Sequence, residues 1–414
     1  MKAVQIGGGL VVLIIAAGAG WWLLRSRLPA PRATQGGLVL VSEGLPQEQE
    51  WRHDFTFADM DGDGVLDLVT APPRKGTEPW PHIFLRYKDR WQQACVDTSW
   101  GGFPDKQTYT YGGVVVADFD GTGVPQIALA MHETGIRLFK SHNRGPCGPW
   151  EERQDLPRAM THMRTRAIVA ADMNRDGRID LVALSEVPAM NAKPDTPGIV
   201  IFWNEAAGWR PQGLPGSEGL FGDDVAVGEV NGDGVPDIAA GSLDDQRPQF
   251  VWLSDGAGGW QAAADGLPEL TIAWSVQLVD LDNDGKDELV FGAGGAPMYQ
   301  NAGPRAYRWD GMRWNSISQG LPQVSWVCGV TAADLDGGGW KEIVAAGMYT
   351  GMVQVYGRQA DGAWAERQSF AVPNAKDLRN YKVRALSVDS ARQEMVVANF
   401  ASESGGEILA WVWR

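Results

Sequence analysis

Apolar and polar positions along this chain form short runs that recur in a fixed order. The run before each Asp-rich segment alternates as a half-buried strand does, as in VVVAD, AVGEV and VQLVD. An apolar run follows directly (LDLVTA, IDLVAL, PDIAAG), and then a run rich in aromatic and β-branched residues (HIFLRYK, GIVIFWN, MVQVYGR). A last short run carries a tryptophan. Each unit therefore predicts four short strands.

Three landmarks mark the repeat of this unit. Turns of the type xLP lie at 44–46, 103–104, 155–157, 213–215, 266–268, 320–322 and 372–373. Acidic loops follow, 51 to 59 residues apart, and open at Asp59, Asp118, Asp172, Glu229, Asp280, Asp334 and Asp389. Most units end in a tryptophan: Trp91, Trp150, Trp209, Trp260, Trp314 and Trp364. Four antiparallel strands at about this period are typical of one β-propeller blade.

The two ends of the repeat region complement each other. Residues 37–46 have the pattern of a fourth strand without the first three, and 406–414 that of a third strand without a fourth. Pairing them would close the ring and leave no free sheet edge. We therefore predict an all-β fold, a seven-bladed β-propeller of four-stranded blades closed by the N-terminal strand. Six or eight blades are the alternatives, because the seventh unit has the weakest acidic loop.

The N-terminus carries an uncharged apolar run of 19 residues from Ile6 to Leu24, about the length that spans a bilayer. Trp21 and Trp22 stand at its end, where interfacial aromatic residues lie, and arginines follow. We predict a transmembrane anchor at 1–26, a Pro/Ala/Arg stalk at 27–36 and the propeller at 37–414. The alternative is a cleaved signal peptide, with a site near residues 17–19.

The acidic loops have the spacing of cation ligands. In 59–67, oxygen-bearing side chains occupy loop positions 1, 3, 5 and 9, with glycine at position 6. Ca²⁺ takes six to eight oxygen ligands, and alternate carboxylates on a tight loop provide them. Four loops are complete, with the ligand candidates Asp59, Asp61, Asp63, Asp67, Asp172, Asn174, Asp176, Asp180, Glu229, Asn231, Asp233, Asp237, Asp280, Asp282, Asp284 and Glu288. We expect about four structural Ca²⁺ sites; the alternative is a set of Asp/Gly turns without metal.

The remaining loops are eroded, and an EF-hand is excluded. The second loop has Thr122 and Gln126 at positions 5 and 9, the sixth has Gly338 at position 5 but keeps Glu342, and the seventh retains little beyond Asp389. An EF-hand requires a bidentate glutamate at position 12 and a following helix. The four complete loops lack this glutamate, and a strand pattern follows each of them.

Acidic loops of this kind within four-stranded repeats resemble the FG-GAP (VCBS) repeats of the integrin α-chain propeller and its bacterial relatives. The resemblance covers 37–414. It implies structural calcium at the four complete loops, with these loops on one face and ligands bound by loops on the other. Members of this family range from adhesion receptors to secreted bacterial proteins, so the resemblance implies no single function.

The net charge limits the classes of binding partner, and the cysteines bear on the compartment. The net charge of −15 argues against nucleic acid and anionic lipid. The three cysteines, Cys95, Cys147 and Cys328, form no C-x-x-C pair, so we expect isolated or buried thiols. A Cys95–Cys147 bridge is the alternative if the domain lies in an oxidising compartment.

We predict a binding or scaffold protein of the adhesion type rather than an enzyme, since no catalytic residues are recognised. His132 and Glu133 lack the second histidine of a zincin motif. Polar and aromatic residues precede the inner strands: His53, Tyr109, Tyr111, His162, Arg164, Arg166, Asp223, Asp224, Trp274, Trp326, Tyr381 and Arg384. The alternative is a polysaccharide lyase or hydrolase that uses this funnel.

We expect a protein or glycan ligand on the face opposite the calcium loops. The predicted contact residues are Trp80, Tyr111, Arg166, Trp274 and Trp326. For orientation, the arginines after the apolar run alone would keep the propeller in the cytoplasm. Weak calcium loops fill only outside it, so we expect a single-pass membrane protein with the propeller on the exocytoplasmic side.

Overall fold

The computed structural model divides the chain into two compact units, Met1–Ala33 and Thr34–Arg414. The described residues all belong to the second unit: 36–52, 54–74, 78, 80–94, 112–132, 135–142, 145–187, 197–243, 251–268, 272–294, 302–324, 326–347, 351–372, 379–386, 395–402 and 405–414. The predicted boundaries 1–26, 27–36 and 37–414 stay a prediction.

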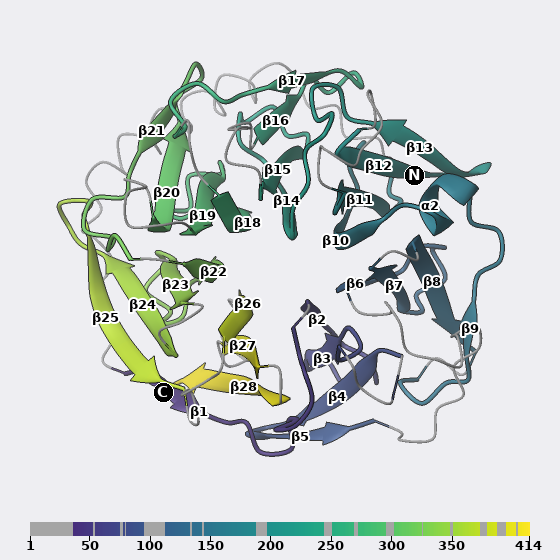
Figure 1. Ribbon diagram of the computed structural model, residues 1–414, viewed down its shortest axis with the longest axis horizontal. Helices are drawn as coiled ribbons and strands as arrows, with labels where there is room; N and C mark the ends of the chain where they lie inside the picture. Colours follow the sequence, from purple (N-terminus) through teal and green to yellow (C-terminus); the bar gives the residue numbers. More distant parts are fainter. Residues whose placement is uncertain are drawn as a thin grey trace, which may run out of the picture. The chain divides into compact units, whose positions relative to one another are not determined.

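Six sheets are blades of four consecutive antiparallel strands, arranged around a common centre in Figure 1. Blade one consists of β2 (Phe55–Ala58), β3 (Asp67–Thr70), β4 (His82–Tyr87) and β5 (Arg90–Gln93). Blade two consists of β6 (Gly112–Ala117), β7 (Gln126–Met131), β8 (Gly135–Ser141) and β9 (Trp150–Glu152). Blade three consists of β10 (Thr165–Ala171), β11 (Asp180–Ser185), β12 (Ile199–Glu205) and β13 (Gly208–Gly213).

The other three blades follow the same order. Blade four consists of β14 (Asp224–Gly228), β15 (Asp237–Gly241), β16 (Val251–Ser254) and β17 (Trp260–Ala262). Blade five consists of β18 (Ile272–Val279), β19 (Glu288–Gly294), β20 (Gly303–Trp309) and β21 (Trp314–Ser316). Blade six consists of β22 (Val327–Ala333), β23 (Glu342–Gly347), β24 (Met352–Arg358) and β25 (Trp364–Ala371).

A seventh sheet is composite, because it joins the two ends of the repeat region. It contains β26 (Arg379–Leu386), β27 (Met395–Ser402), β28 (Gly405–Trp413) and β1 (Leu38–Leu40), with Leu38 paired to Trp413. The predicted fold class is therefore wrong in the number of blades, which is six and not seven. The repeating blade of four consecutive strands occurs six times, and the composite sheet fills the gap between blade six and blade one (Figure 1).

The predicted transmembrane helix finds no counterpart in the part of the chain that the structure describes, where no helix has the length and apolar character to cross a bilayer. The apolar run from Ile6 to Leu24 lies outside the described residues. A short helix that the sequence did not predict, α2 (Arg158–Thr161), follows the turn at 155–157. Pro157 precedes its first residue, and the fixed φ of proline suits a helix start.

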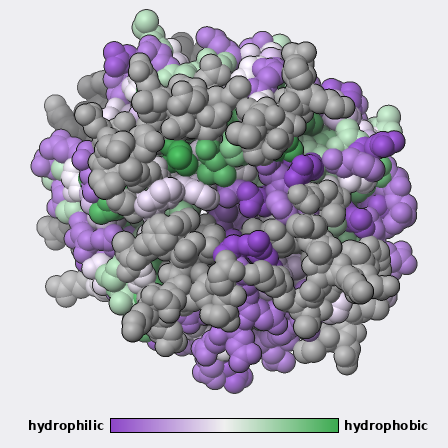
Figure 2. Space-filling view, in the orientation of Figure 1, coloured by the Kyte–Doolittle hydropathy of each residue, from purple (hydrophilic) through white to green (hydrophobic). Residues whose placement is uncertain are grey.

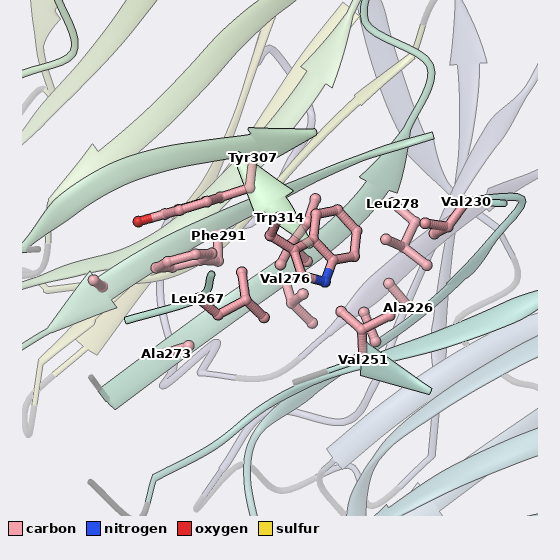
Figure 3. Packing of buried hydrophobic residues seen from close by; sticks show 13 residues of the cluster. Ala226, Val230, Val251, Leu267, Ala273, Val276, Leu278, Phe291, Tyr307 and Trp314 are labelled. Carbon is pink, nitrogen blue, oxygen red and sulfur yellow. The ribbon is translucent and has the colours of Figure 1, made fainter. Parts of the chain in front are cut away.

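The core lies between neighbouring sheets rather than at the centre of the ring. Each of seven buried apolar clusters joins two adjacent sheets. Between blades four and five, Trp314 packs with Val276 and Leu267, and Tyr307 stacks on Phe291 with ring centroids 5.6 Å apart (Figure 3). Burial of such faces against each other is the main favourable term in folding.

The residues just before an xLP turn accept hydrogen bonds from the tryptophan in the last strand of the blade that follows the turn. The backbone N–H of Trp314 donates to Asp265 O at 2.8 Å, and its indole N–H donates to Ala263 O at 3.0 Å. Gly266 follows Asp265 with φ +86, and a Cβ there would lie 2.1 Å from Trp314 O. Only glycine fits this backbone at such an approach. The same paired bonds hold two further tryptophans, Trp91 and Trp364.

Candidate functional site

Acidic loops join the first and second strands of the six blades. We call them loop one (59–67), loop two (118–126), loop three (172–180), loop four (229–237), loop five (280–288) and loop six (334–342). Consecutive antiparallel strands place all six on the same side of their blades. The seventh predicted loop, which opens at Asp389, lies outside the described residues.

Loop one shows how the sequence holds these carboxylates in place. Asp59 accepts the backbone N–H groups of Gly62 and Gly64 at 2.8 and 2.9 Å. Asp67, at position nine, accepts the N–H groups of Met60 and Arg86, both at 2.9 Å. Glycines with φ above +80 at 62 and 64 permit the tight path of the backbone. The backbone thus fixes the first and last carboxylates.

Loops three and four repeat this geometry with an asparagine at position three. Asp180 and Asp237 each accept two backbone N–H groups at 2.7 to 3.0 Å, as Asp67 does. The amide oxygens of Asn174 and Asn231 accept the N–H of the residue two positions on, at 3.1 and 2.8 Å. In loop one the carboxylate of Asp61 accepts the corresponding N–H at 3.1 Å. The oxygen at position three is therefore held in the same way in all three loops.

Carboxylate oxygens converge to within 4.8 Å of one another in three loops. The groups are Asp59, Asp61 and Asp67 in loop one, Asp280, Asp282 and Glu288 in loop five, and Asp334, Asp336 and Glu342 in loop six. Loop six was classed as eroded from its sequence because Gly338 stands at position 5. Positions 1, 3 and 9, which do converge, were intact and could have identified it.

Burial perturbs the position-nine carboxyls. It raises the pKa of Asp67 and Asp180 to about 6, and that of Asp237 to about 7, against the backbone hydrogen bonds that lower these values. Removal of water disfavours the charged form of a carboxylate. Burial likewise raises the pKa of Glu288 in loop five and of Glu342 in loop six to about 7, so this effect is common to five of the described loops. A bound cation would offset the penalty.

Three loops already contain a positively charged side chain. In loop five, Arg308 Nη2 lies 2.6 Å from Asp282 Oδ2, and its Nε lies 2.7 Å from Glu288 Oε1. Arg358 Nη1 lies 3.5 Å from the same Asp282 Oδ2. In loop six, Arg367 Nη1 lies 2.6 Å from both Asp336 Oδ2 and Glu342 Oε1. In loop two, Lys140 Nζ lies 2.5 Å from Asp120 Oδ2. Burial would raise the pKa of Asp120, but the bond from Lys140 contributes to lowering it to about 2.

Loops one, three and four have no such neighbour. Within the described ranges, no Lys, Arg or His nitrogen forms an ion pair with their carboxylates. Arg175 and Lys286 pass close to the backbone of loop four at Gly234 and Gly232, without an ion pair to its acids. The described acids of these three loops thus have no basic ion-pair partner, whereas those of loops two, five and six do.

A second cluster of charged groups links the inner ends of the sheets. Asp224 is buried, and its Oδ1 lies 3.1 Å from Lys382 Nζ and 3.2 Å from Arg384 Nη2. Arg384 also contacts Asp54 at 2.7 Å. Ser275 Oγ and Val276 N donate to Asp224 Oδ2 at 2.8 and 3.0 Å. The cluster connects blades one, four and five with the composite sheet.

Of the predicted ligand-face residues, the structure describes Trp80, Arg166, Trp274 and Trp326. Trp274 and Trp326 are neighbours, with ring centroids 6.2 Å apart and planes at 56°. Arg166 lies in ion pairs with Glu186 at 3.0 Å and Asp223 at 2.6 Å. No described contact joins Trp80 to the two tryptophans, and Tyr111 lies outside the described residues. Figure 2 shows hydrophilic and hydrophobic residues side by side near the middle of the ring.

The cysteines fall into two states. Cys328 is a free, buried thiol whose pKa burial raises above its usual value. Cys147 is disulfide-bonded, contrary to the expectation of isolated thiols. Cys95, the partner considered from the sequence, lies outside the described residues.

Comparison with known proteins supports the resemblance seen in the sequence. Residues 229–291, which include loops four and five, match the FG-GAP-like repeat family. The human T-cell immunomodulatory protein is 28% identical over 188 residues, which make up 44% of this chain and 29% of that protein. The match thus spans less than a third of the relative.

Solved structures share the fold. Crystal structures of BBS1N in complex with ARL6DN, soaked with lead or with mercury, superpose with a TM-score of 0.52. They are 11% and 12% identical, and the alignments cover 91% and 92% of this chain and 95% and 96% of those chains. At this identity the likeness shows the fold alone.

Proposed function

We propose that this chain, an FG-GAP-repeat β-propeller, is a calcium-stabilised, membrane-anchored binding or scaffold protein. One observation carries the calcium part. In loops one, three and four the third and ninth oxygen-bearing side chains are held by the same backbone hydrogen bonds, and no basic side chain is paired to the described acids of these loops. Hard oxygen donors in this number and spacing suit Ca²⁺.

The donor set also indicates what calcium does. Position nine belongs to the second strand and positions one and three to the loop before it, so a bound ion would tie the loop to the blade. The ion would also neutralise the buried carboxylates Asp67, Asp180 and Asp237, whose raised pKa values reflect their burial. Calcium therefore has a structural role in this proposal.

Calcium removal is expected to lower the melting temperature of the full chain in detergent. Binding to the folded state alone contributes about 2.7 kcal/mol per site at 100-fold excess over Kd. EGTA should therefore lower the melting temperature of the wild type more than that of a triple variant, Asp61→Ala with Asn174→Ala and Asn231→Ala. Asp361→Ala, in an exposed turn, is the control and should respond like the wild type. Melting curves that EGTA leaves unchanged would refute the proposed calcium role.

The binding surface is proposed to centre on Trp274 and Trp326, on the face opposite the acidic loops. Their adjacent rings are partly exposed, and Trp326 has φ +57, an uncommon conformation for a bulky residue. Tryptophan is enriched among interface residues that dominate binding energy, and a protein or glycan ligand suits such a pair. Arg166 is held by carboxylates and serves to position the surface rather than to contact a ligand.

Loss of both rings is expected to abolish binding without unfolding the protein. In pull-downs with the full chain from the cell surface, Trp274→Ala with Trp326→Ala should weaken capture at least 30-fold, since each such residue contributes about 2 kcal/mol or more. Met312→Ala, which removes an 83% exposed side chain, should leave capture unchanged. Undiminished capture by the double variant would place the binding surface elsewhere.

The propeller is proposed to lie outside the cytoplasm, tethered through the apolar run at the N-terminus. Disulfides persist in oxidising compartments, and Cys147 is disulfide-bonded. Loops other than EF-hands, like extracellular modules, fill at about 10⁻⁴–10⁻³ M calcium, which the cytosol does not supply. The arginines after the run oppose this orientation under the positive-inside rule.

Protease accessibility distinguishes the two orientations. Trypsin added to intact cells or spheroplasts is expected to cut the stalk between Arg25 and Arg32 and release the propeller. A cytoplasmic protein serves as the control and should stay intact until lysis. Protection of the stalk until lysis would mean that the propeller faces the cytoplasm.

A further inference from the structure

The residue opposite position nine differs among the six described acidic loops: it is basic in two, apolar in three and glycine in one. In blade two, Gln126 pairs with Lys140 across β7 and β8. In blade five, Leu289 pairs with Tyr307, so Glu288 faces Arg308 in the continued register. In the same way, loops one, three and four have an apolar residue at this place: Leu85, Trp203 and Leu253.

Blade six also places a basic side chain on its acidic loop, but this side chain comes from the fourth strand and not from the third. Ile343 pairs with Tyr356, so Gly357 faces position nine, and it carries no side chain. Arg367 on β25 fills this space, since a Cβ at Gly357 would lie 2.4 Å from Arg367 Cδ. Its Nη1 then contacts the acids at positions three and nine. Arg367 can therefore reach these acids only because residue 357 is a glycine.

The positively charged groups of these basic side chains contact the same carboxylates that would bind a metal ion. Arg308 and Arg367 each join the carboxylates at positions three and nine, at 2.6 to 2.7 Å. Lys140 contacts position three alone, and in its loop position nine is the neutral Gln126. Loop five also receives Arg358, whose Nη1 lies 3.5 Å from Asp282 Oδ2, so a basic group contacts the position-three acid in each of these loops. A guanidinium bridging two carboxylates forms strong charge-assisted hydrogen bonds.

We propose that a basic side chain of the protein itself takes the place of calcium in loops two, five and six, so that the chain binds three calcium ions, in loops one, three and four. The proposal rests on the proposed calcium role, and it corrects the sequence-based expectation of a site in loop five. It also explains why loop six keeps converging acids without a complete ligand set.

Calcium stoichiometry of the full chain in detergent, measured by equilibrium dialysis, tests this assignment. We expect three ions per wild-type chain, two for Asp61→Ala and three for Asp282→Ala. Arg308→Leu with Arg358→Leu removes both guanidinium groups that contact Asp282, and this double variant should bind four. Arg313→Leu, which removes a positive charge from the exposed turn of the hairpin that carries Arg308, should bind three.

Loss of one ion in Asp282→Ala, or no gain in the folded arginine double variant, would overturn the proposal. If the arginine double variant does not fold, the two Asp→Ala variants decide. A wild-type chain that binds no calcium would refute both the proposed calcium role and this assignment. Four or more ions per wild-type chain would refute the assignment and leave the calcium role intact.

Discussion

Replacing Trp314 by alanine is expected to lower the free energy of unfolding by about 3–5 kcal/mol, the range for large aromatic residues truncated in a core. Trp314 is fully buried between blades four and five, against Val276 and Leu267 (Figure 3). The change creates a cavity at this junction and also leaves the carbonyl of Ala263 without the indole donor. Urea unfolding followed by circular dichroism measures the loss.

Two controls separate the packing from the hydrogen bond. Trp314→Phe keeps an aromatic ring but not the indole N–H, and should cost less than Trp314→Ala. Met312→Ala, two residues earlier in the same hairpin, removes an exposed side chain and should change the stability by less than about 0.5 kcal/mol. A Trp314→Ala protein as stable as the wild type would contradict the role assigned to the junction.

Replacing Asp224 by alanine is expected to cost about 3–5 kcal/mol, the range for one partner removed from a buried ion pair. The change leaves Lys382, only 8% exposed, without its carboxylate. Burial alone would raise the pKa of Asp224, but Lys382 and Arg384 hold it below its usual value. Its contribution to stability is therefore present above the unfolded pKa and is lost as the pH falls through the lower, folded one.

A double-mutant cycle isolates the pair. Adding Lys382→Met to Asp224→Ala should recover part of the stability, because the second variant removes the buried charge that has lost its carboxylate. Asp155→Ala breaks the pair of Asp155 with Arg153, in which Asp155 is 62% exposed, and should cost about 1 kcal/mol or less. Strict additivity of Asp224→Ala and Lys382→Met would show that the two charges do not interact.

The repeat and its landmarks were readable in the sequence because they depend on local chemistry. The alternation before each loop, the glycines at positions such as 64 and 177, and the acids at positions 1, 3 and 9 reflect strand geometry and tight turns. Pairing of the two chain ends was also readable, since an unpaired strand at each end calls for a partner. Recognition of the FG-GAP-like repeat followed from these features.

Contacts between distant residues were not readable. Gly266 and Trp314 each appeared as a mark of a repeat boundary, and only packing brings them together across a blade junction. Arg384 lies 330 residues from Asp54 in the chain but forms an ion pair with it. No local pattern encodes such a pair, because it depends on the ring that brings the composite sheet next to blade one.

The acidic loops show where the division lies. The sequence by itself determined where oxygen-bearing side chains gather, because ligand spacing is a property of one short loop. The tertiary structure alone decided which loops already contain a positive charge. Arg308 lies 20 residues after Glu288, and Arg367 lies 25 residues after Glu342, each on another strand of the same blade. A charge supplied across strands depends on register and on free space, such as that at Gly357, and both exist only once the blade has folded.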